Sequence, residues 1–166
     1  NLTSYASYIA DAGFCGDRKL YSGIGYGTNS TYYASYNRLQ LNKTPTFSCP
    51  QTDDLYTLTT NSSGNKKLSY PVGLIFADEV VYAGGVYDIG NYIYYLQNAS
   101  NYWTQTPHSY SSIFSSAEVY GLNTSGSIRV YDVPVGYDVR PVISLKSDIT
   151  ITGGTGTLTD PWIVTP

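Results

Sequence analysis

Apolar residues occur in short stretches along this chain, each interrupted by Gly, Asn, Ser or Pro. Near the start, the helical spacing i, i+3, i+4, i+7 is formed by Tyr5, Tyr8, Ile9 and Ala12. This spacing predicts a short amphipathic helix, with Thr3 or Ser4 as its N-cap and Gly13 as its stop. Residues 19–36 are rich in Gly, Ser, Thr and Tyr without any period, which predicts a long ordered loop.

The segment 70–85, "YPVGLIFADEVVYAGG", is predicted to be a buried strand followed by a short helix. Asp78 and Glu79 suit the first helical turn, because carboxylates are favoured at the positive end of the helix dipole. The glycine pair 84–85 ends the segment. Further strands, short and alternating or β-branched, are predicted at 55–59, 91–97, 115–122, 127–133 and 139–146, with a hairpin at 149–164. The predicted fold class is α+β, with short helices beside a mainly antiparallel sheet and many loops.

Length and charge narrow the class of protein. The 166 residues fit one domain, and with 13% charged residues and a formal charge of -3 the chain lacks the basic surface that binds nucleic acid or anionic lipid. Its apolar runs are too short to span a bilayer. Because the sequence opens at Asn1 without Met, we expect residues 1–166 to be a single extracellular domain whose anchoring or pilin-like N-terminal helix has been removed.

The chain has two cysteines, Cys15 and Cys49. We expect them to form a disulfide, because a composition rich in Tyr, Thr, Ser, Asn and Gly is typical of secreted and surface proteins in oxidising surroundings. Two separate buried thiols are the alternative interpretation. The disulfide would place the domain outside the cell, on the surface or in a surface filament.

Catalytic groups are scarce, and we expect no enzyme. His108 is the single histidine, and its polar surroundings, "TQTPHSYSS", predict a solvated side chain in a loop. No GxSxG motif is present, and there are too few Cys and His residues for a zinc site. The acidic pair 53–54 is interpreted as a turn, and the pair 78–79 as a helix start. Arg140 lies between apolar residues and is interpreted as a structural residue that pairs with an acid or a carbonyl.

Tyrosine dominates the aromatic residues, with 19 Tyr against 4 Phe. Tyr is favoured where one end of an aromatic ring stays wet, and Tyr with Ser, Gly and Asn is typical of adaptable binding surfaces. The predicted ligand-binding residues are Tyr87, Tyr92, Tyr94, Tyr95, Tyr102, Trp103 and Tyr110. The competing interpretation is that about half of these rings point inward and complete a core that is poor in Phe and Leu.

The ordered blocks "FCGDR", "NRLQLNKTPTFSCP", "YPVGLIFADEVVYAGG", "YWTQTP", "VRPVISLKSDITITGGTGT" and "DPWIV" resemble the DUF6273-type surface domains of gut Firmicutes and Mollicutes-like bacteria. Chains of that family often begin with a prepilin-like or membrane-anchoring helix. More distantly, the chain is similar to the C-type-lectin-like core of formylglycine-generating enzymes. The resemblance implies a C-type-lectin-like fold with a helix over 78–83 and a loop-rich face over 86–137. It implies no reaction, since formylglycine-type chemistry needs a reactive thiol late in the chain and both cysteines lie in the first third.

Two functions follow as expectations. The first is a non-catalytic binding or adhesion module whose Tyr-rich face recognises a glycan or a host or bacterial surface protein. The alternative is a structural subunit, the globular head of a pilin-like filament, whose partners are copies of itself. No cofactor is expected; calcium stays open because C-type-lectin-like loops can bind it, although the chain has no DxDxDG loop.

Overall fold

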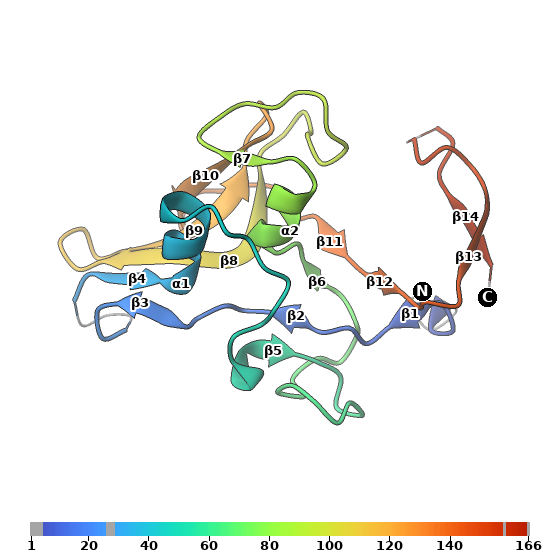
Figure 1. Cartoon of the computed structure of the whole chain (residues 1–166), viewed down its shortest axis with the longest axis horizontal. Coiled ribbons are helices and arrows are strands. Elements are labelled where there is room, and N and C mark those ends of the chain that lie inside the picture. Colours follow the sequence, from blue (N-terminus) through green and yellow to red (C-terminus); the bar gives the residue numbers. More distant parts are fainter. Residues whose placement is uncertain (1–4, 26–28, 158, 166) are drawn as a thin grey trace.

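A six-stranded mixed sheet, in the order β3-β4-β8-β9-β10-β7, forms the centre of the computed structural model (Figure 1). The structure describes residues 5–25, 29–157 and 159–165. Neighbouring strands are antiparallel except for the parallel pair β10 and β7. The strands are β3 (Leu20–Ser22), β4 (Thr31–Tyr33), β7 (Val86–Tyr87), β8 (Tyr102–Ser111), β9 (Ser116–Leu122) and β10 (Ser127–Asp132).

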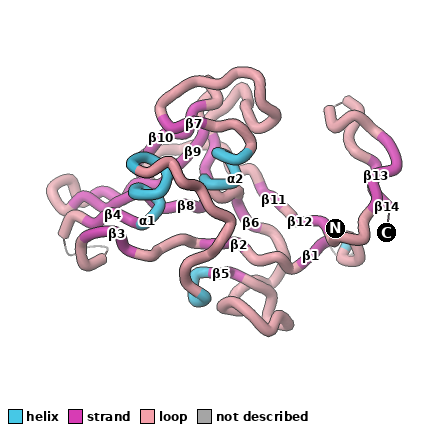
Figure 2. Tube along the Cα trace, viewed as in Figure 1, coloured by secondary structure: helices cyan, strands magenta, loops and turns pink. Residues whose placement is uncertain are grey.

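The remaining strands form four short antiparallel pairs, and much of the chain around them is loop (Figure 2). The pairs are β1 (Ile9–Ala10) with β12 (Ser144–Leu145), β2 (Phe14–Cys15) with β5 (Leu55–Tyr56), β6 (Gly73–Leu74) with β11 (Pro141–Val142), and β13 (Thr150–Gly153) with β14 (Ile163–Thr165). The helices are α1 (Ala34–Tyr36), the π-helix η2 (Asn37–Leu41), the 3-10 turn η3 (Thr52–Asp54) and α2 (Ala77–Tyr82). The fold is therefore mainly β with a few short helices.

The hydrophobic core lies between one face of the sheet and the segments η2 and α2. Its buried members are Leu39, Ile75, Ala77, Val80, Tyr102, Tyr120, Leu122 and Ile128. Tyr102, Tyr120 and Ile128 lie on the adjacent strands β8, β9 and β10, and their side chains pack in one cluster on the same face of the sheet. Two of the largest core side chains are tyrosines, which agrees with the interpretation that Tyr compensates for scarce Phe.

Within 70–85 the predicted helix is confirmed as α2, and the predicted strand is confirmed in shortened form as β6, which is half-buried and not buried as expected. Glu79 caps the start of the helix, because its carboxylate accepts the backbone N–H of Phe76 at 2.8 Å. Gly84 ends it with a φ of 118°, a conformation that a residue with a Cβ adopts only under strain.

The longest strand, β8, was not predicted. Pro107 lies inside it and lacks the N–H that a regular ladder needs. The pairing with β9 shifts register on both sides of Pro107, so a bulge absorbs this residue. Because of the bulge, His108 and Ser109 are both buried although they are neighbours in sequence.

The predicted N-terminal helix is wrong. Tyr8 donates its N–H to the Tyr5 carbonyl in a tight turn, and the chain then pairs as β1 with β12. A helix of this length gains little by itself, so strand pairing and the burial of Ile9 decide the structure. The proposed N-caps at positions 3 and 4 lie outside the described residues.

The predicted loop over 19–36 is also wrong. It contains β3 and β4, which pair antiparallel, followed by α1. Gly23, with a φ of 84°, begins the turn between the two strands, where a Cβ would lie 2.6 Å from the Ser30 carbonyl oxygen.

Two further expectations about the middle of the chain need correction. The predicted strand at 91–97 is a turn region, held by the Asn91 N–H on the Ser125 carbonyl and the Tyr94 hydroxyl on the Gly126 carbonyl. The expected loop-rich face over 86–137 contains the three longest strands, and its long loop is confined to 88–101.

The other predicted strands are confirmed in shortened form. The segments 115–122 and 127–133 are β9 and β10, and 139–146 supplies β11 and β12. Within 55–59 the strand β5 is shorter than predicted, and Leu58 forms a single bridge with Leu68. The hairpin at 149–164 is β13 and β14, which projects away from the sheet as an arm at the right of Figure 1.

Candidate functional site

A groove of about 710 Å³ runs between α2, the pair β6–β11 and the pair β2–β5. Its aromatic lining consists of Phe14, Phe47, Phe76, Tyr82 and Tyr95. A smaller hollow of about 240 Å³ also borders Ile75, Tyr95 and Val142, and ends at Arg140. We call the two hollows together the aromatic groove. Its volume falls in the range of clefts that bind small molecules or short segments of a partner.

One wall of the aromatic groove is a stacked pair of rings. Phe47 and Tyr82 lie 4.3 Å apart between centroids with an angle of 17° between their planes, and both are largely exposed. The Tyr82 hydroxyl donates to the Pro45 carbonyl at 2.8 Å, which fixes the ring on the loop that carries Phe47. The wall therefore presents exposed aromatic surface with a restricted orientation.

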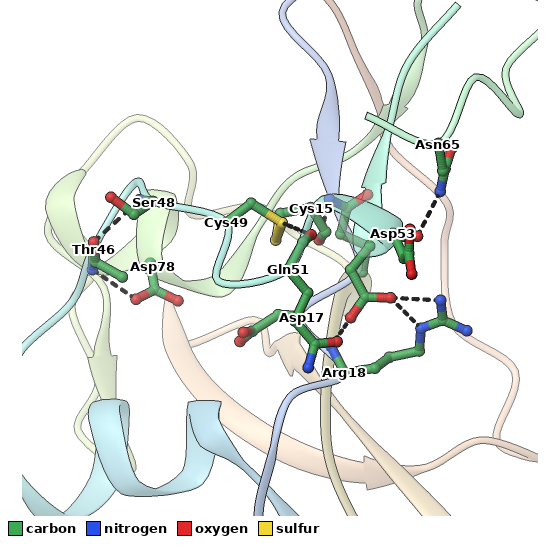
Figure 3. Close-up of a disulfide and its surroundings, with 12 residues drawn as sticks. Cys15, Asp17, Arg18, Thr46, Ser48, Cys49, Gln51, Asp53, Asn65 and Asp78 are labelled. Carbon is green, nitrogen blue, oxygen red and sulfur yellow. Dashed lines mark hydrogen bonds and ion pairs between the residues drawn. A yellow bond between two sulfur atoms is a disulfide. The ribbon is translucent and has the colours of Figure 1, made fainter. Parts of the chain in front are cut away.

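The predicted disulfide between Cys15 and Cys49 is present and holds this loop in place (Figure 3). It joins β2 to the loop that carries Phe47, and both cysteines line the aromatic groove. The Thr46 N–H donates to Asp78 at the start of α2 at 2.8 Å, a second attachment of the same loop. In the chain-entropy picture, a bridge that closes a loop of this size stabilises the fold by roughly 3 to 4 kcal/mol.

The floor of the aromatic groove is mostly aliphatic. Ile75 and Val142 belong to the region of β6 and β11, and Ile75 is nearly fully buried. Gln105 of β8 supports this floor from the sheet: its N–H donates to the Ile75 carbonyl at 3.0 Å and its side-chain amide donates to the Cys15 carbonyl at 2.7 Å.

Charged groups stand at two places along the aromatic groove. Glu79 is exposed beside Tyr82, at the start of α2. Arg140 borders the far hollow, and its guanidinium carbon lies 4.8 Å from the centroid of the Tyr102 ring. Arg140 was expected to pair with an acid or a carbonyl; its observed partner is an aromatic ring.

A buried ion network supports α2 beneath the groove. Arg38 of η2 donates to Asp78 at 2.6 and 2.7 Å and to Asp17 at 2.7 Å. Burial raises the pKa of Asp17, and the hydrogen bond from Arg38 opposes this rise. For Arg38, burial lowers the pKa, but the hydrogen bonds to Asp78 and Asp17 outweigh it and raise the pKa overall. A similar pair joins Arg18 to the buried Asp54 of η3, in the acidic segment interpreted as a turn.

The seven predicted binding residues do not form one surface. Tyr102 and Tyr110 are buried, with 2% and 9% of their surface exposed, whereas Tyr92 and Tyr95 are 69% and 81% exposed. Tyr87, Tyr94 and Trp103 are half-buried. Tyr95 lines the aromatic groove and Tyr102 lies below its far end.

Two of these tyrosines anchor the loop 88–101. Tyr102 donates its hydroxyl to the Leu96 carbonyl at 2.7 Å, and Tyr94 donates to the Gly126 carbonyl at 2.9 Å. Burial raises the pKa of the hydroxyl of each. Their role in the fold is therefore to hold the loop from which Tyr95 projects.

Trp103 belongs to a separate cluster. Its ring lies 5.0 Å from that of Tyr137 and 6.2 Å from that of Tyr131, and the two tyrosine rings are 4.6 Å apart. Tyr131 covers Gly121, where an added Cβ would come within 3.1 Å of the ring. The cluster seats the turn after β10 against the sheet.

His108 is buried, with 7% of its surface exposed, so the expected solvated side chain is wrong. Its Nδ1 lies 2.8 Å from the Ser109 hydroxyl and 3.3 Å from Glu118, and Ser109 donates to Glu118 directly. Burial lowers the pKa of His108, and Glu118 opposes this. In a Ser-His-acid triad the Ser and the acid face opposite ring nitrogens. Here both face Nδ1, and Nε2 is buried without a hydrogen-bond partner in the described part of the chain.

Neither a metal site nor a membrane-spanning helix is found among the residues that the structure describes. Within residues 5–25, 29–157 and 159–165, no group of three or more His, Cys, Asp or Glu side chains is placed to hold a metal ion. Over the same ranges, no helix is long and apolar enough to cross a membrane.

Comparison with family models, curated proteins and solved structures gives no match. The resemblance to DUF6273-type domains therefore stays a prediction.

Sequence reasoning missed the groove residues Phe47, Tyr82 and Phe14. Phe47 lies two residues before Cys49 and Phe14 one residue before Cys15, so the predicted bridge already implied that these two rings come near each other. Tyr82 lay at the end of the predicted helix, where a ring left outside the core is available to a neighbouring loop.

Proposed function

We propose that this chain is a non-catalytic recognition domain of a bacterial surface and that the aromatic groove binds its ligand. The observation that carries the proposal is the exposed, stacked pair of rings Phe47 and Tyr82, which line the groove together with Tyr95. The disulfide holds the loop that carries Phe47 in place. Rigid, exposed aromatic rings supply contact area at low entropic cost, as in other binding surfaces.

The lining favours a polypeptide segment as the ligand. Leu55 and Val142, both half-buried, offer an aliphatic surface that suits an apolar side chain better than the hydroxyls of a sugar. An apolar side chain of a partner protein would be buried there, between the aromatic walls. Glu79 and Arg140 carry opposite charges at separate points, which suits the polar backbone and charged ends of a short peptide segment.

We also propose a distant relationship to C-type-lectin-like domains. Its support is the order of sequence blocks, together with a short helix that packs on a mainly antiparallel sheet beside the long loop 88–101. An experimental structure whose sheet order differs from that fold would contradict this relationship.

The test is binding of the purified chain to peptide and glycan arrays, followed by titration of any ligand with single variants. We expect Tyr95→Ala and Phe47→Ala to weaken binding by about 2 kcal/mol, roughly thirtyfold in Kd, as for a central aromatic contact. Tyr92→Ala is the matched control, because Tyr92 is also exposed in the loop 88–101 and does not line the groove.

The outcomes separate the parts of the proposal. Equal losses for Tyr92→Ala and Tyr95→Ala would move the site from the groove to the loop as a whole. Binding to glycans alone would overturn the polypeptide ligand and keep the recognition function. Binding that survives both groove variants, in chains that stay folded, would overturn the groove as the site.

A second candidate function, a subunit of a surface filament, is favoured by the arm β13–β14. Ile151, Trp162 and Ile163 are exposed on this arm, which projects away from the sheet (Figure 1). A contact between the arm of one copy and another part of the next copy would build an open chain of subunits. Analytical ultracentrifugation tests this: concentration-dependent polymers that Ile151→Asp with Ile163→Asp abolishes would support the filament, and a monomer at all concentrations would exclude assembly by this chain alone.

A further inference from the structure

A second hollow of about 440 Å³ lies on another side of α2 and borders none of the residues of the aromatic groove. We call it the η2 pocket, since the π-helix η2 forms part of its wall. The residues used in the argument below are Leu39, Gln40, Lys43, Val81, Tyr87 and Asp88. The α2 helix separates the two hollows, because Val81 faces the η2 pocket while Glu79 and Tyr82 face the groove.

The backbone around the η2 pocket is unusual at three points. A π-helix such as η2 is rare in proteins and is frequently found at functional sites. Lys43 and Asp88, which are not glycines, both have left-handed φ values, of 54° and 60°. Such conformations are costly and cluster at binding sites, where the surrounding fold holds them for a purpose other than stability.

The interior of the η2 pocket is aliphatic. Leu39 is buried in the hydrophobic core, and Val81 packs against that core from α2. Gln40 is already used, because its amide donates to the Tyr120 hydroxyl at 3.1 Å. An occupant of this interior therefore meets mostly hydrocarbon, and a polar tail would lose its hydrogen bonds to water without replacement.

Charge at the η2 pocket is unbalanced. Asp88 already has a cationic partner, because its carboxylate forms an ion pair with Arg129. Lys43 is exposed, and it takes part in no ion pair within the described ranges of the chain. An unpaired ammonium beside an aliphatic hollow complements a ligand with one negative head and an apolar tail.

We propose that the η2 pocket binds a small amphipathic carboxylic acid. The apolar tail lies against Leu39 and Val81, and the carboxylate contacts the Lys43 ammonium. The single cation makes this a site for one carboxylate rather than for a phosphate group, which usually takes several donors. This site is independent of the aromatic groove, so either proposal can fail without the other.

The experiment titrates the full chain with octanoate, octanol and octylammonium, using calorimetry for affinity and amide chemical shifts for location. We expect octanoate to bind at least tenfold more tightly than octanol, and octylammonium to bind no better than octanol. Shifts should concentrate on the amides of Lys43, Val81 and Asp88. Equal binding of the three probes, or shifts that lie elsewhere, would overturn the proposal.

Variants at two lysines decide whether Lys43 acts through its charge. Lys43→Gln should weaken octanoate binding about tenfold and leave octanol binding unchanged, whereas Lys43→Arg should retain octanoate binding. Lys66→Gln is the matched control, since Lys66 is also an exposed, left-handed lysine, with a φ of 57°, and does not line the η2 pocket. Equal effects of Lys43→Gln and Lys66→Gln would show only a general change of charge and would refute the site.

Discussion

The change Arg38→Met tests whether the buried ion network supports the fold as its geometry indicates. The guanidinium of Arg38 contacts Asp17 at 2.7 Å and Asp78 at 2.6 Å, and both aspartate side chains are fully buried. Methionine keeps much of the apolar contact of the arginine stem but removes the charge and the donors. Two carboxylates would then remain in the protein interior without a cation.

Removing one partner of a buried ion pair typically costs about 3 to 5 kcal/mol, because the remaining charge has lost its solvation and its partner. For a domain whose total stability is about 5 to 15 kcal/mol, this is a large share. We expect urea unfolding, followed by fluorescence of the two Trp residues, to show the loss as a lower midpoint. The comparison is Arg129→Met, whose pair with Asp88 is exposed and should change the unfolding free energy by less than about 1 kcal/mol.

The pH dependence has a definite sign. Burial already raises the pKa of Asp17 in the folded state, and without Arg38 that pKa should rise further. The folded variant then binds more protons than the unfolded chain, so its deficit should shrink as the pH is lowered from 7 towards 5 and grow as the pH rises. Adding Asp17→Asn and Asp78→Asn should restore most of the stability. A deficit below about 1 kcal/mol for Arg38→Met, or one that grows at low pH, would refute this reasoning.

Three further outcomes are expected. Replacing Cys15 and Cys49 with Ser should lower the free energy of unfolding by about 3 kcal/mol and weaken any ligand of the aromatic groove; an unchanged urea midpoint would contradict the role of the bridge. Gly121→Ala should cost about 1 to 3 kcal/mol in the same assay, because the new methyl group would lie 2.9 Å from the Tyr102 carbonyl oxygen and 3.1 Å from the Tyr131 ring, and serine should cost no less. Burial lowers the pKa of His108 below its ordinary value of 6.5, so the free energy of unfolding should fall as the pH is lowered through that value. His108→Phe should make the urea midpoint change less between pH 7 and 5 than it does in the unmodified chain. An equal pH dependence of the two midpoints would exclude His108 as the cause.

Features that depend on neighbours in sequence were the most predictable. The strand and helix at 70–85 follow from an apolar run, two acids and two glycines in order, and the structure places β6 and α2 there. The hairpin at 149–164 follows from a glycine-rich turn between β-branched segments. The disulfide was inferred from composition, and the fold brings the two Cα atoms to 5.5 Å.

Features that depend on distant parts of the chain were missed. The strand β8 carries polar residues and Pro107, and its pattern makes sense only beside β9, where a bulge accommodates the proline. The segment at 5–12 has helical spacing, yet it becomes β1 because β12 is available as a partner. The sequence neighbours of His108 are polar and suggest a solvated side chain. In the fold, however, its ring contacts the rings of three tyrosines, on β4, α1 and β9.

The tyrosines show where sequence reasoning about this candidate site reaches its limit. Tyr94 and Tyr95 are adjacent and chemically identical, but Tyr94 bonds to the carbonyl of Gly126 while Tyr95 projects over the groove. The difference depends on the turn between β9 and β10, about 30 residues later, which supplies the acceptor. A phenol beside such a buried acceptor becomes part of the fold, and one without it stays at the surface. Composition therefore predicts that a Tyr-rich chain has aromatic surface to offer a ligand. Which rings stay exposed depends on where the fold places backbone carbonyls that need a hydrogen-bond donor.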